Sequence, residues 1–279
     1  MSPKISTVRR NFAALQTPLI CPLCRAALNL QDNSFRCSGG HCYDLSTKNY
    51  LNLAPQQKQL AIYDADFFST RRRIFQAGFY APLTQQIADI CHDLQQQLGR
   101  PISVLDAGCG EGFFAMELLQ NLGEDKAEII ALDLARDGVI MAAKACPGLK
   151  CVVGDLSALP IGEDGADVIL NILSPANYQE FARVLRPHGL LLKVIPGADY
   201  LRQVRQAYNL SPGQDSDAEK LLAAAVAGYN TTRLTYTLPV TAAQAADLLK
   251  MSPLAHHHTA TAADFNEITI DLQLLSARF

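Results

Sequence analysis

The chain has 279 residues and a formal net charge of −3; 49% of its residues are hydrophobic and 18% are charged. These values describe an ordinary globular protein with enough chain for one or two domains and a sizeable core. No apolar stretch approaches the ~20 residues of a membrane-spanning helix, and the first twenty residues hold no long apolar block of the signal-peptide kind. We therefore expect a soluble protein with neither a membrane span nor a signal peptide.

Charge is unevenly distributed along the chain. Residues 1–80 contain ten Lys and Arg against four acids, a balance of +6, whereas the remainder contains fourteen against twenty-three, a balance of −9. A basic first part on an acidic body suits a polyanionic partner approached through the N-terminal end. Small zinc modules are also often basic without such a partner, so the asymmetry alone leaves both interpretations open.

The eight cysteines fall into a cluster and a scattered set. Cys21-Pro-Leu-Cys24 is followed after twelve residues by Cys37 and then by the neighbours His41 and Cys42. A C-x₂-C knuckle aims two thiolates at one point, and a second, glycine-rich knuckle offers Cys37 with either His41 or Cys42 to close a tetrahedral Zn²⁺ site. Such a site is structural because it keeps no open position for catalysis. Outside it, four cysteines in apolar contexts read as small core residues: 91, 109, 146 and 151.

The flanks of this cluster predict a small module and a linker. We expect residues 1–17 to be loosely structured, 43–54 to form a strand and turn that complete the module, and 55–68 to be a polar linker. The predicted domains are therefore 1–60 and 61–279.

A helix is expected after the linker, capped by Ser69 or Thr70 and ended by Gly78. Its Arg71, Arg72 and Arg73 would lie on an exposed side facing the zinc module. There they would serve either as phosphate contacts or as a solvated helix end.

From Tyr80 onward helices and strands alternate. A helix carries the apolar stripe Leu83, Ile87, Ile90, Leu94 and Leu98, and the pattern then predicts strands at 102–106, 128–133, 150–153, 167–173 and 190–195 with helices at 112–122, 136–146 and 177–185. This order predicts an α/β, doubly wound parallel sheet. Beyond 196 we expect helical residues 199–228 with a loop at 211–217, a strand at 231–240, a helix at 241–251 and a closing strand at 267–275.

The glycine-rich stretch 104–114 predicts a cofactor loop. It reads Val-Leu-Asp106-Ala-Gly108-Cys-Gly110-Glu111-Gly112-Phe-Phe, a strand, a tight turn and a helix whose N-terminus offers free N–H groups. Acids stand at three successive strand ends: Asp106, Asp133 and Asp155. Asp133 can accept hydrogen bonds from the ribose hydroxyls of a cofactor. Asp155 can accept one from the adenine amino group, with Leu156 beside the adenine ring. Because Asp106 and Glu111 would repel a pyrophosphate and suit an ammonium and a sulfonium, S-adenosylmethionine is favoured over NAD.

These motifs resemble the class I methyltransferases, whose Rossmann-like fold the central part is expected to share. Over residues 20–279 the chain resembles the RlmA family of 23S rRNA guanine-N1 methyltransferases. Besides the glycine loop, the matching segments are Cys21–Cys24, Cys37 with His41, Tyr50–Leu53, Arg72-Arg73, Ala77–Leu83 and Leu248–Pro253.

The resemblance implies a cytoplasmic enzyme that methylates N1 of one guanine in a hairpin loop of domain II of 23S rRNA, near the macrolide-binding tunnel and hence relevant to macrolide resistance. Residues 1–60 would recognise the RNA, and family members tend to form homodimers. It also favours His41 over Cys42 as the fourth zinc ligand. The expected cofactor contacts are Tyr80, Asp106, Gly108, Gly110, Glu111, Gly112, Asp133, Leu134, Asp155, Leu156, Asn171 and Tyr200.

The target base normally lies beside the residues that follow the fourth strand, so Asn171, Ser174 and Tyr178 are the catalytic candidates. Loop capping is an equally good interpretation of these three side chains, and the sequence offers no obvious general base for the N1 proton. Two other functions fit the same sequence. One is a small-molecule methyltransferase with a structural zinc module, and the other is a non-catalytic zinc-bearing RNA-binding regulator.

Overall fold

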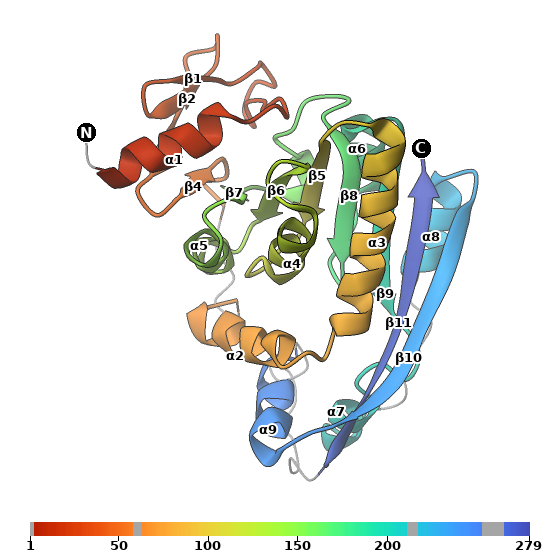
Figure 1. Ribbon diagram of the computed structural model, residues 1–279. Helices are drawn as coiled ribbons and strands as arrows, with labels where there is room; N and C mark the ends of the chain where they lie inside the picture. The colour runs from red at the N-terminus through yellow and green to blue at the C-terminus, as the bar shows by residue number, and fades with distance from the viewer. Residues whose placement is uncertain (1–2, 58–62, 211–216, 253–264) are drawn as a thin grey trace.

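The computed structural model describes residues 3–57, 63–210, 217–252 and 265–279 (Figure 1). Within these residues the strands join into one eleven-stranded sheet in the order β1-β2-β3-β4-β7-β6-β5-β8-β9-β11-β10. Its centre is formed by parallel strands β5 (Ile102–Ala107), β6 (Ala127–Asp133), β7 (Lys150–Val153), β8 (Ala166–Ile172) and β9 (Leu185–Pro196). The predicted doubly wound, Rossmann-like α/β fold is thereby confirmed.

The central strands are apolar throughout because both faces of the sheet are covered. On β5 the side chain of Val104 packs on one face and that of Leu105 on the other, and Ile129 and Ile130 divide in the same way on β6. One face carries α3 (Ala81–Leu98), α4 (Phe113–Leu122) and α5 (Arg136–Ala145), and the other carries α6 (Tyr178–Val184) and α8 (Asp217–Ala225) together with the N-terminal module.

The N-terminal module is built into the edge of this sheet. It consists of α1 (Pro3–Ala13), β1 (Asn29–Gln31), β2 (Ser34–Arg36), β3 (Cys42–Ser46) and β4 (Tyr50–Asn52). Strand β4 lies parallel to β7, with Tyr50 opposite Cys151. The Glu128 carboxylate of β6 also accepts bonds from the backbone N–H and the hydroxyl of Thr17. The two parts therefore share one sheet, and the predicted boundary at residue 60 lies outside the described residues.

The opposite edge is an antiparallel hairpin, drawn in blue in Figure 1. β10 (Tyr229–Pro239) pairs with β11 (Glu267–Arg278), which in turn pairs antiparallel with β9. The lower part of Figure 1 shows the short α7 (Arg202–Ala207), α2 (Ala65–Gln76) and α9 (Ala242–Lys250), of which α2 and α9 contact each other. No helix in the described part of the chain has the length and apolar character that crossing a membrane requires.

Three sequence-based expectations differ from the structure. Residues 1–17 include the helix α1, whose Val8 and Phe12, one turn apart, are buried against the module. The helix expected at Ser69 begins four residues earlier, because Asp64 accepts a bond from the backbone N–H of Phe67 at 2.8 Å and caps it. The fifth strand begins at Leu185 instead of 190. Most of the loop expected at 211–217 lies outside the described residues.

Candidate active site and metal centre

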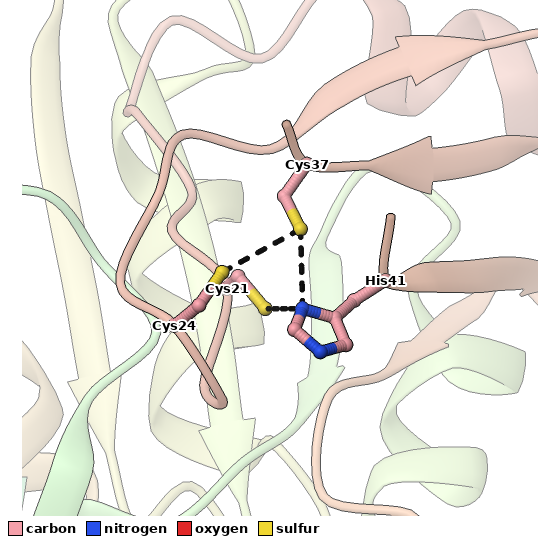
Figure 2. Close-up of side chains that lie close together, drawn as sticks. All are labelled: Cys21, Cys24, Cys37 and His41. Carbon is pink, nitrogen blue, oxygen red and sulfur yellow. Dashed lines mark hydrogen bonds between the residues drawn. The ribbon is translucent and has the colours of Figure 1, made fainter. Parts of the chain in front are cut away.

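Four side chains of the N-terminal module converge as the sequence predicts: Cys21, Cys24, Cys37 and His41 (Figure 2). Their ligand atoms lie within 4.8 Å of one another. His41 Nδ1 is 3.4 Å from Cys21 Sγ and 3.3 Å from Cys37 Sγ, and the Cys24 and Cys37 sulfurs are 3.6 Å apart. Tetrahedral Zn²⁺ would space such atoms by about 3.5–3.8 Å, so this donor set fits a structural zinc ion.

The structure separates the two candidates for the fourth position. His41 turns its Nδ1 into the cluster, whereas Cys42 is exposed and its thiol donates to Asp44 Oδ1. Tyr43 lies behind the cluster, with its hydroxyl 3.4 Å from Cys21 Sγ. Burial opposes ionisation of Cys21, but hydrogen bonds from the Tyr43 hydroxyl and from backbone N–H groups outweigh it and bring the pKa of this thiol to about 6. Cys21 is therefore readily available as a thiolate.

A cavity of about 1020 Å³ opens at the carboxyl ends of the parallel strands. This is at the upper end of the ~300–1,000 Å³ typical of small-molecule sites, and it lies where ligands bind in doubly wound sheets. The three glycines of the predicted loop all have positive φ, of which Gly108 at +89° is the most closely packed. We call this space the cofactor cleft. Its lining includes Gly108, Gly110, Asp133, Leu134, Asp155 and Leu156 on one side, and 172–179 on the other.

Two of the predicted acids line the cleft and also hold its backbone. Asp133 accepts bonds from the N–H groups of Gly110 at 2.8 Å and Ala135 at 2.7 Å, which fixes its carboxylate at the end of β6. Asp155 caps the short 3₁₀ helix η1 (Leu156–Ala158) through the N–H of Ser157. Each carboxylate retains lone pairs that could accept hydroxyl or amino groups of a ligand.

A second group of polar atoms is buried near the glycine loop and has no hydrogen-bond partner among the described residues. It consists of Asp106 Oδ2, both carboxylate oxygens of Glu111 and Nε of Arg71. Arg71 and Glu111 form an ion pair at 3.6 Å, and the Arg71 guanidinium lies 4.9 Å from the ring centre of Phe75. Buried polar atoms without partners are rare and costly, and a ligand with an ammonium and a carboxylate would satisfy this set. The amino-acid end of S-adenosylmethionine fits that description.

Burial shifts the protonation of these carboxyls. Burial first, and the neighbouring Asp133 charge second, raise the pKa of Asp106 to about 7. Burial also raises the pKa of Glu111, which the Arg71 charge partly opposes, and that of Asp133, which the N–H groups of Ala135 and Gly110 partly oppose. A bound cation would favour the ionised form of all three.

Tyr80 and Tyr200 lie farther along the same region. Their hydroxyls are 2.7 Å apart, and Tyr80 is fully buried at the start of α3. Tyr200 lines a second cavity of about 380 Å³, mainly apolar, beside the cofactor cleft. Met251, from the family-specific segment at the end of α9, lines it too. The two cavities share Tyr63, Arg71, Leu173, Ser174, Pro175, Lys193 and Ala218.

The three catalytic candidates are placed differently. Ser174 lines both cavities and packs against Gly108, and Tyr178 lines the cofactor cleft while its hydroxyl donates to the Ala218 carbonyl. Asn171 is fully buried and lines neither cavity. Its Nδ2 donates to the carbonyls of Ala107 and Pro175, and its Oδ1 accepts from Lys193, so its amide is engaged by the protein. The roles predicted for these three residues stay predictions.

The expectation that Arg71, Arg72 and Arg73 form an exposed face towards the zinc module is wrong. Arg71 points to the glycine loop, Arg72 donates to the carbonyls of Glu111 and Met141, and Arg73 forms a two-pronged ion pair with Asp247 on α9. Consecutive helical residues are ~100° apart, so three neighbours reach three surroundings.

Sequence reasoning missed Arg71 and Lys193 as site residues. A run of three arginines resembles a solvated helix end, so Arg71 carried no distinguishing signal. Lys193 did carry one, because it is the single charged residue in the apolar run Leu190–Ile195, and a lysine is almost never fully buried without a partner.

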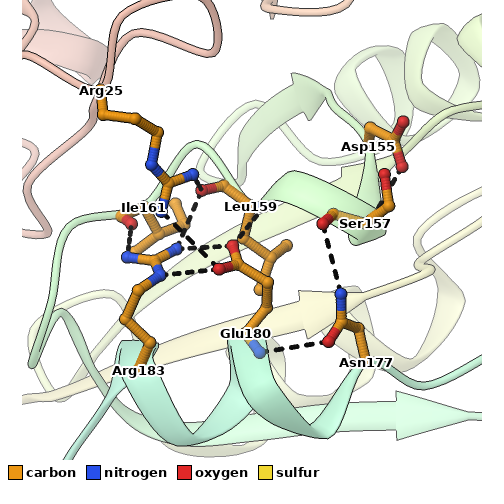
Figure 3. Close-up of polar contacts among 8 residues, drawn as sticks. All are labelled: Arg25, Asp155, Ser157, Leu159, Ile161, Asn177, Glu180 and Arg183. Atoms are coloured by element: carbon orange, nitrogen blue, oxygen red, sulfur yellow. Dashed lines mark hydrogen bonds and ion pairs between the residues drawn. The ribbon is translucent and has the colours of Figure 1, made fainter.

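A polar network connects the zinc knuckle to both sides of the cleft (Figure 3). Arg25, next to Cys24, pairs with Glu180 at 3.6 Å, and Glu180 also accepts from Arg183 and from the N–H of Leu159. Asn177 then joins Glu180 to Ser157, which is bonded to Asp155. Loop 155–161 and the start of α6 are thus held together beside the metal cluster.

Two parts of the chain match the models of known protein families. Residues 19–60 match the model of the RlmA N-terminal zinc ribbon, and residues 104–189 match a methyltransferase domain. The protein is therefore a methyltransferase with a zinc ribbon, and the groups that its two sites take are S-adenosylmethionine and a structural zinc ion.

Two similar proteins indicate the family of methyltransferases to which the chain belongs. YxjB of Bacillus subtilis, provisionally named a 23S rRNA (guanine-N(1)-)-methyltransferase, is 35% identical over 84% of this chain and 86% of its own length. The 23S rRNA (guanine(748)-N(1))-methyltransferase of Streptomyces fradiae is 33% identical over 73% of this chain and 72% of its own. The chain belongs to the RlmA family of guanine-N1 methyltransferases, as the sequence motifs predict.

Proposed function

We propose that this chain transfers a methyl group from S-adenosylmethionine to N1 of one guanine in a hairpin loop of domain II of 23S rRNA, beside the macrolide-binding tunnel. The names of the two relatives support the RNA, the base and the atom. The hairpin follows from the family resemblance. The proposal includes a cytoplasmic enzyme that acts as a homodimer and whose product bears on macrolide resistance.

One observation carries this proposal: strand pairing and a hydrogen bond join the zinc module to the edge of the cofactor cleft. Strand β4 pairs with β7, and a few residues later Gln57 Nε2 donates to Asp155 Oδ2 at 3.1 Å. A small-molecule methyltransferase has no use for a second binding element at this place. A large substrate such as a folded RNA does, because it can be held by one part of its surface while one base enters the cleft.

Each part of the chain has a task in this proposal. Residues 1–60 recognise the RNA and 61–279 bind the cofactor and the base. Cys21, Cys24, Cys37 and His41 ligate the zinc ion. Bound S-adenosylmethionine supplies an electrophilic methyl group, and the chain must bind it, orient the base and exclude water. The residues proposed to hold it are Asp133 at the ribose, Asp155, Leu134 and Leu156 at the adenine, Gly108 and Gly110 in the loop, and Asp106, Glu111, Tyr80 and Tyr200 near the amino-acid end. Gly112, the third glycine predicted to contact the cofactor, packs against Ala142 of α5 and is not among the residues that line the cleft.

Primer extension across 23S rRNA tests the proposal, because a methyl group on N1 blocks the pairing edge of guanine and stops reverse transcription. A strain without this gene should lose one stop in a domain II hairpin. The full chain should restore the stop, and a Cys37→Ser variant, which loses a zinc ligand, should not. An unchanged pattern of stops would contradict the proposal and favour a small-molecule substrate or a non-catalytic role.

A further inference from the structure

Lys193 is a buried amine at the centre of the site. It lies near the carboxyl end of β9 and is 3% exposed, with Asn171 of β8 and Leu275 of β11 beside it in the sheet. Among the residues that the structure describes, no carboxylate lies within ion-pair distance of its Nζ. A lysine buried without a counter-charge is costly, so its presence here calls for a function.

The hydrogen bonds of Lys193 leave one position on its nitrogen unused. Nζ donates to Asn171 Oδ1 at 2.6 Å and to the carbonyl of Ser174. Asn171 is itself held by its two Nδ2 bonds, so its oxygen is fixed towards Lys193. An ammonium has three N–H groups, but a neutral amine has two N–H groups and one lone pair. When both N–H groups of the neutral amine are donated to these acceptors, only the lone pair remains for a ligand.

Lys193 also lies where the reacting atoms must meet. It lines both the cofactor cleft and the second cavity, so it is at their junction. Arg71 is the other basic group that lines both cavities in the described part of the chain, and an arginine does not give up its proton in a protein. The acids Asp133 and Asp155 line only the cofactor cleft. The amine is therefore the group best placed to take a proton from a base in the second cavity.

We propose that the neutral amine of Lys193 is the general base that accepts the N1 proton of the target guanine, an assignment that rests on the function proposed above. The N1–H bond breaks, its proton forms a third N–H bond on Nζ, and its electron pair stays on N1. That pair forms the bond to the methyl carbon while the bond between methyl and sulfur breaks and sulfur keeps its electrons. The ammonium returns the proton to water after the product leaves.

The electrostatic surroundings agree with this role. Burial lowers the pKa of Lys193 to about 8, so about a tenth of it is neutral at pH 7 and most of it above pH 8.5. On the flanking strands the acids Asp167 and Asp271 are each engaged by arginine. The other titratable or charged groups that line the two cavities are Tyr63, Arg71, Asp133, Asp155, Tyr178 and Tyr200.

The first test is the pH dependence of single-turnover methyl transfer to a 23S rRNA domain II fragment. The wild-type rate should rise about tenfold per pH unit up to about pH 8 and then level. Lys193→Arg keeps a cation and hydrogen-bond donors but has no available lone pair, so it should lose about 10²–10⁴-fold in rate and lose the inflection near pH 8. Lys193→Met should do the same, while S-adenosylmethionine affinity measured by calorimetry changes less than about threefold. Lys150→Arg, a lysine of β7 that donates to the Gly148 carbonyl, is the matched control and should behave as wild type.

The possible outcomes separate the two proposals. A Lys193→Arg variant within a few-fold of wild type would overturn the base assignment, since a cation that only contacts the carbonyl oxygen of guanine would suffice. A wild-type rate independent of pH below 8 would overturn it as well. A wild-type protein that methylates no domain II RNA at any pH would instead overturn the function on which the assignment rests.

A second measurement needs no RNA. In protein labelled with ¹³C at lysine Cε, one resonance that Lys193→Met removes should titrate with a pKa near 8. An ordinary lysine titrates near 10.4. A Lys193 resonance that titrates at or above that value would overturn the proposal irrespective of the substrate.

Discussion

The cofactor cleft and the second cavity meet at Ser174 and Lys193, yet they are built on opposite plans. On the cofactor side, Asp106 and Glu111 are buried with oxygen atoms that have no hydrogen-bond partner in the described part of the chain. Beside the second cavity, Lys193 has two protein acceptors, and Asn171, which is buried next to it and lines neither cavity, has its amide engaged by the protein. The cofactor side therefore needs a polar ligand to pair its buried oxygen atoms, whereas on the other side the polar groups already have protein partners and the cavity is mainly apolar. The first plan suits binding of a charged molecule, and the second suits the positioning of a flat base and the transfer of its proton.

The largest effect is expected where the two sides touch. A Cβ added at Gly108 would lie 2.0 Å from Ser174 Oγ and 2.7 Å from Ser174 Cβ, at a φ of +89°. Gly108→Ala should therefore displace the loop after β8 and weaken S-adenosylmethionine binding at least ~100-fold, measured by calorimetry. Gly78→Ala is the matched control, because Gly78 has φ +86° and no atom within 4 Å of its Cβ position. It should show only the backbone strain and keep the affinity. Equal effects of the two substitutions would mean that the contact between the two sides does not matter.

The second prediction concerns the incomplete side without its ligand. Burial first, and the Asp133 charge second, raise the pKa of Asp106 to about 7, against about 4 in the unfolded chain. Between these values the folded protein holds more protons than the unfolded one, so the contribution of Asp106 to the free energy of unfolding falls as pH rises from 4 to 7. Asp106→Asn should remove this dependence on pH. Between pH 4 and 7.5 its free energy of unfolding should come to exceed that of the wild type by up to about 4 kcal/mol. Urea unfolding of the cofactor-free protein at each pH measures this free energy. The exposed Asp93→Asn is the control, and parallel pH curves for wild type and Asp106→Asn would contradict the prediction.

The third prediction separates binding from chemistry. Asp133→Ala removes the acceptor for the N–H groups of Gly110 and Ala135 and the carboxylate proposed to hold the ribose. We expect the dissociation constant of S-adenosylmethionine to rise about 10–100-fold, or about 1.4–2.7 kcal/mol, while the exposed Asp137→Ala on α5 keeps it. Lys193→Arg should show the reverse, a normal dissociation constant with a slow reaction. If Asp133→Ala binds the cofactor normally but reacts slowly, the division of tasks between the two sides is wrong.

The sequence predicts the cofactor side far better than the other. Strands β5, β6 and β7, which lead to Asp106, Asp133 and Asp155, are short apolar runs bounded by glycines and acids, and this local pattern directly reflects burial on both faces of a parallel sheet. The zinc cluster is nearly as local, because ligand spacing brings Cys21, Cys24 and Cys37 together and leaves only the fourth position open between the neighbours His41 and Cys42, where the family resemblance favours His41.

The remaining features depend on contacts between distant residues. Strand β4 has only three residues, and it pairs with β7, which follows about a hundred residues later in the chain. The local sequence of such a short strand does not reveal its partner. Arg71 resembles its two exposed-looking neighbours until α2 is packed against the glycine loop. Asn171 resembles a substrate contact because of its place near the carboxyl end of the fourth strand, but the partners that engage its amide come from two other segments as well as its own. Lys193 stands out in the sequence as a charged residue within an apolar strand, but its proposed role depends on where Asn171 and Ser174 lie in the structure.

The smallest predicted effect lies in the link between the zinc knuckle and the two sides. Arg25 pairs with Glu180 at 3.6 Å, and its side chain is 43% exposed, so solvent weakens the pair. Arg183 holds Glu180 with two shorter bonds of 2.8 and 2.7 Å, which remain when Arg25 is removed. Arg25→Ala should therefore cost less than about 1 kcal/mol in unfolding free energy and change S-adenosylmethionine affinity less than about twofold. Arg183→Ala, which also loses bonds to the carbonyls of Leu159 and Ile161, should cost more on both counts. If Arg25→Ala proved the more damaging of the two, the zinc knuckle would be holding the cleft in shape, and the two sides could not be treated as independent of the module beside them.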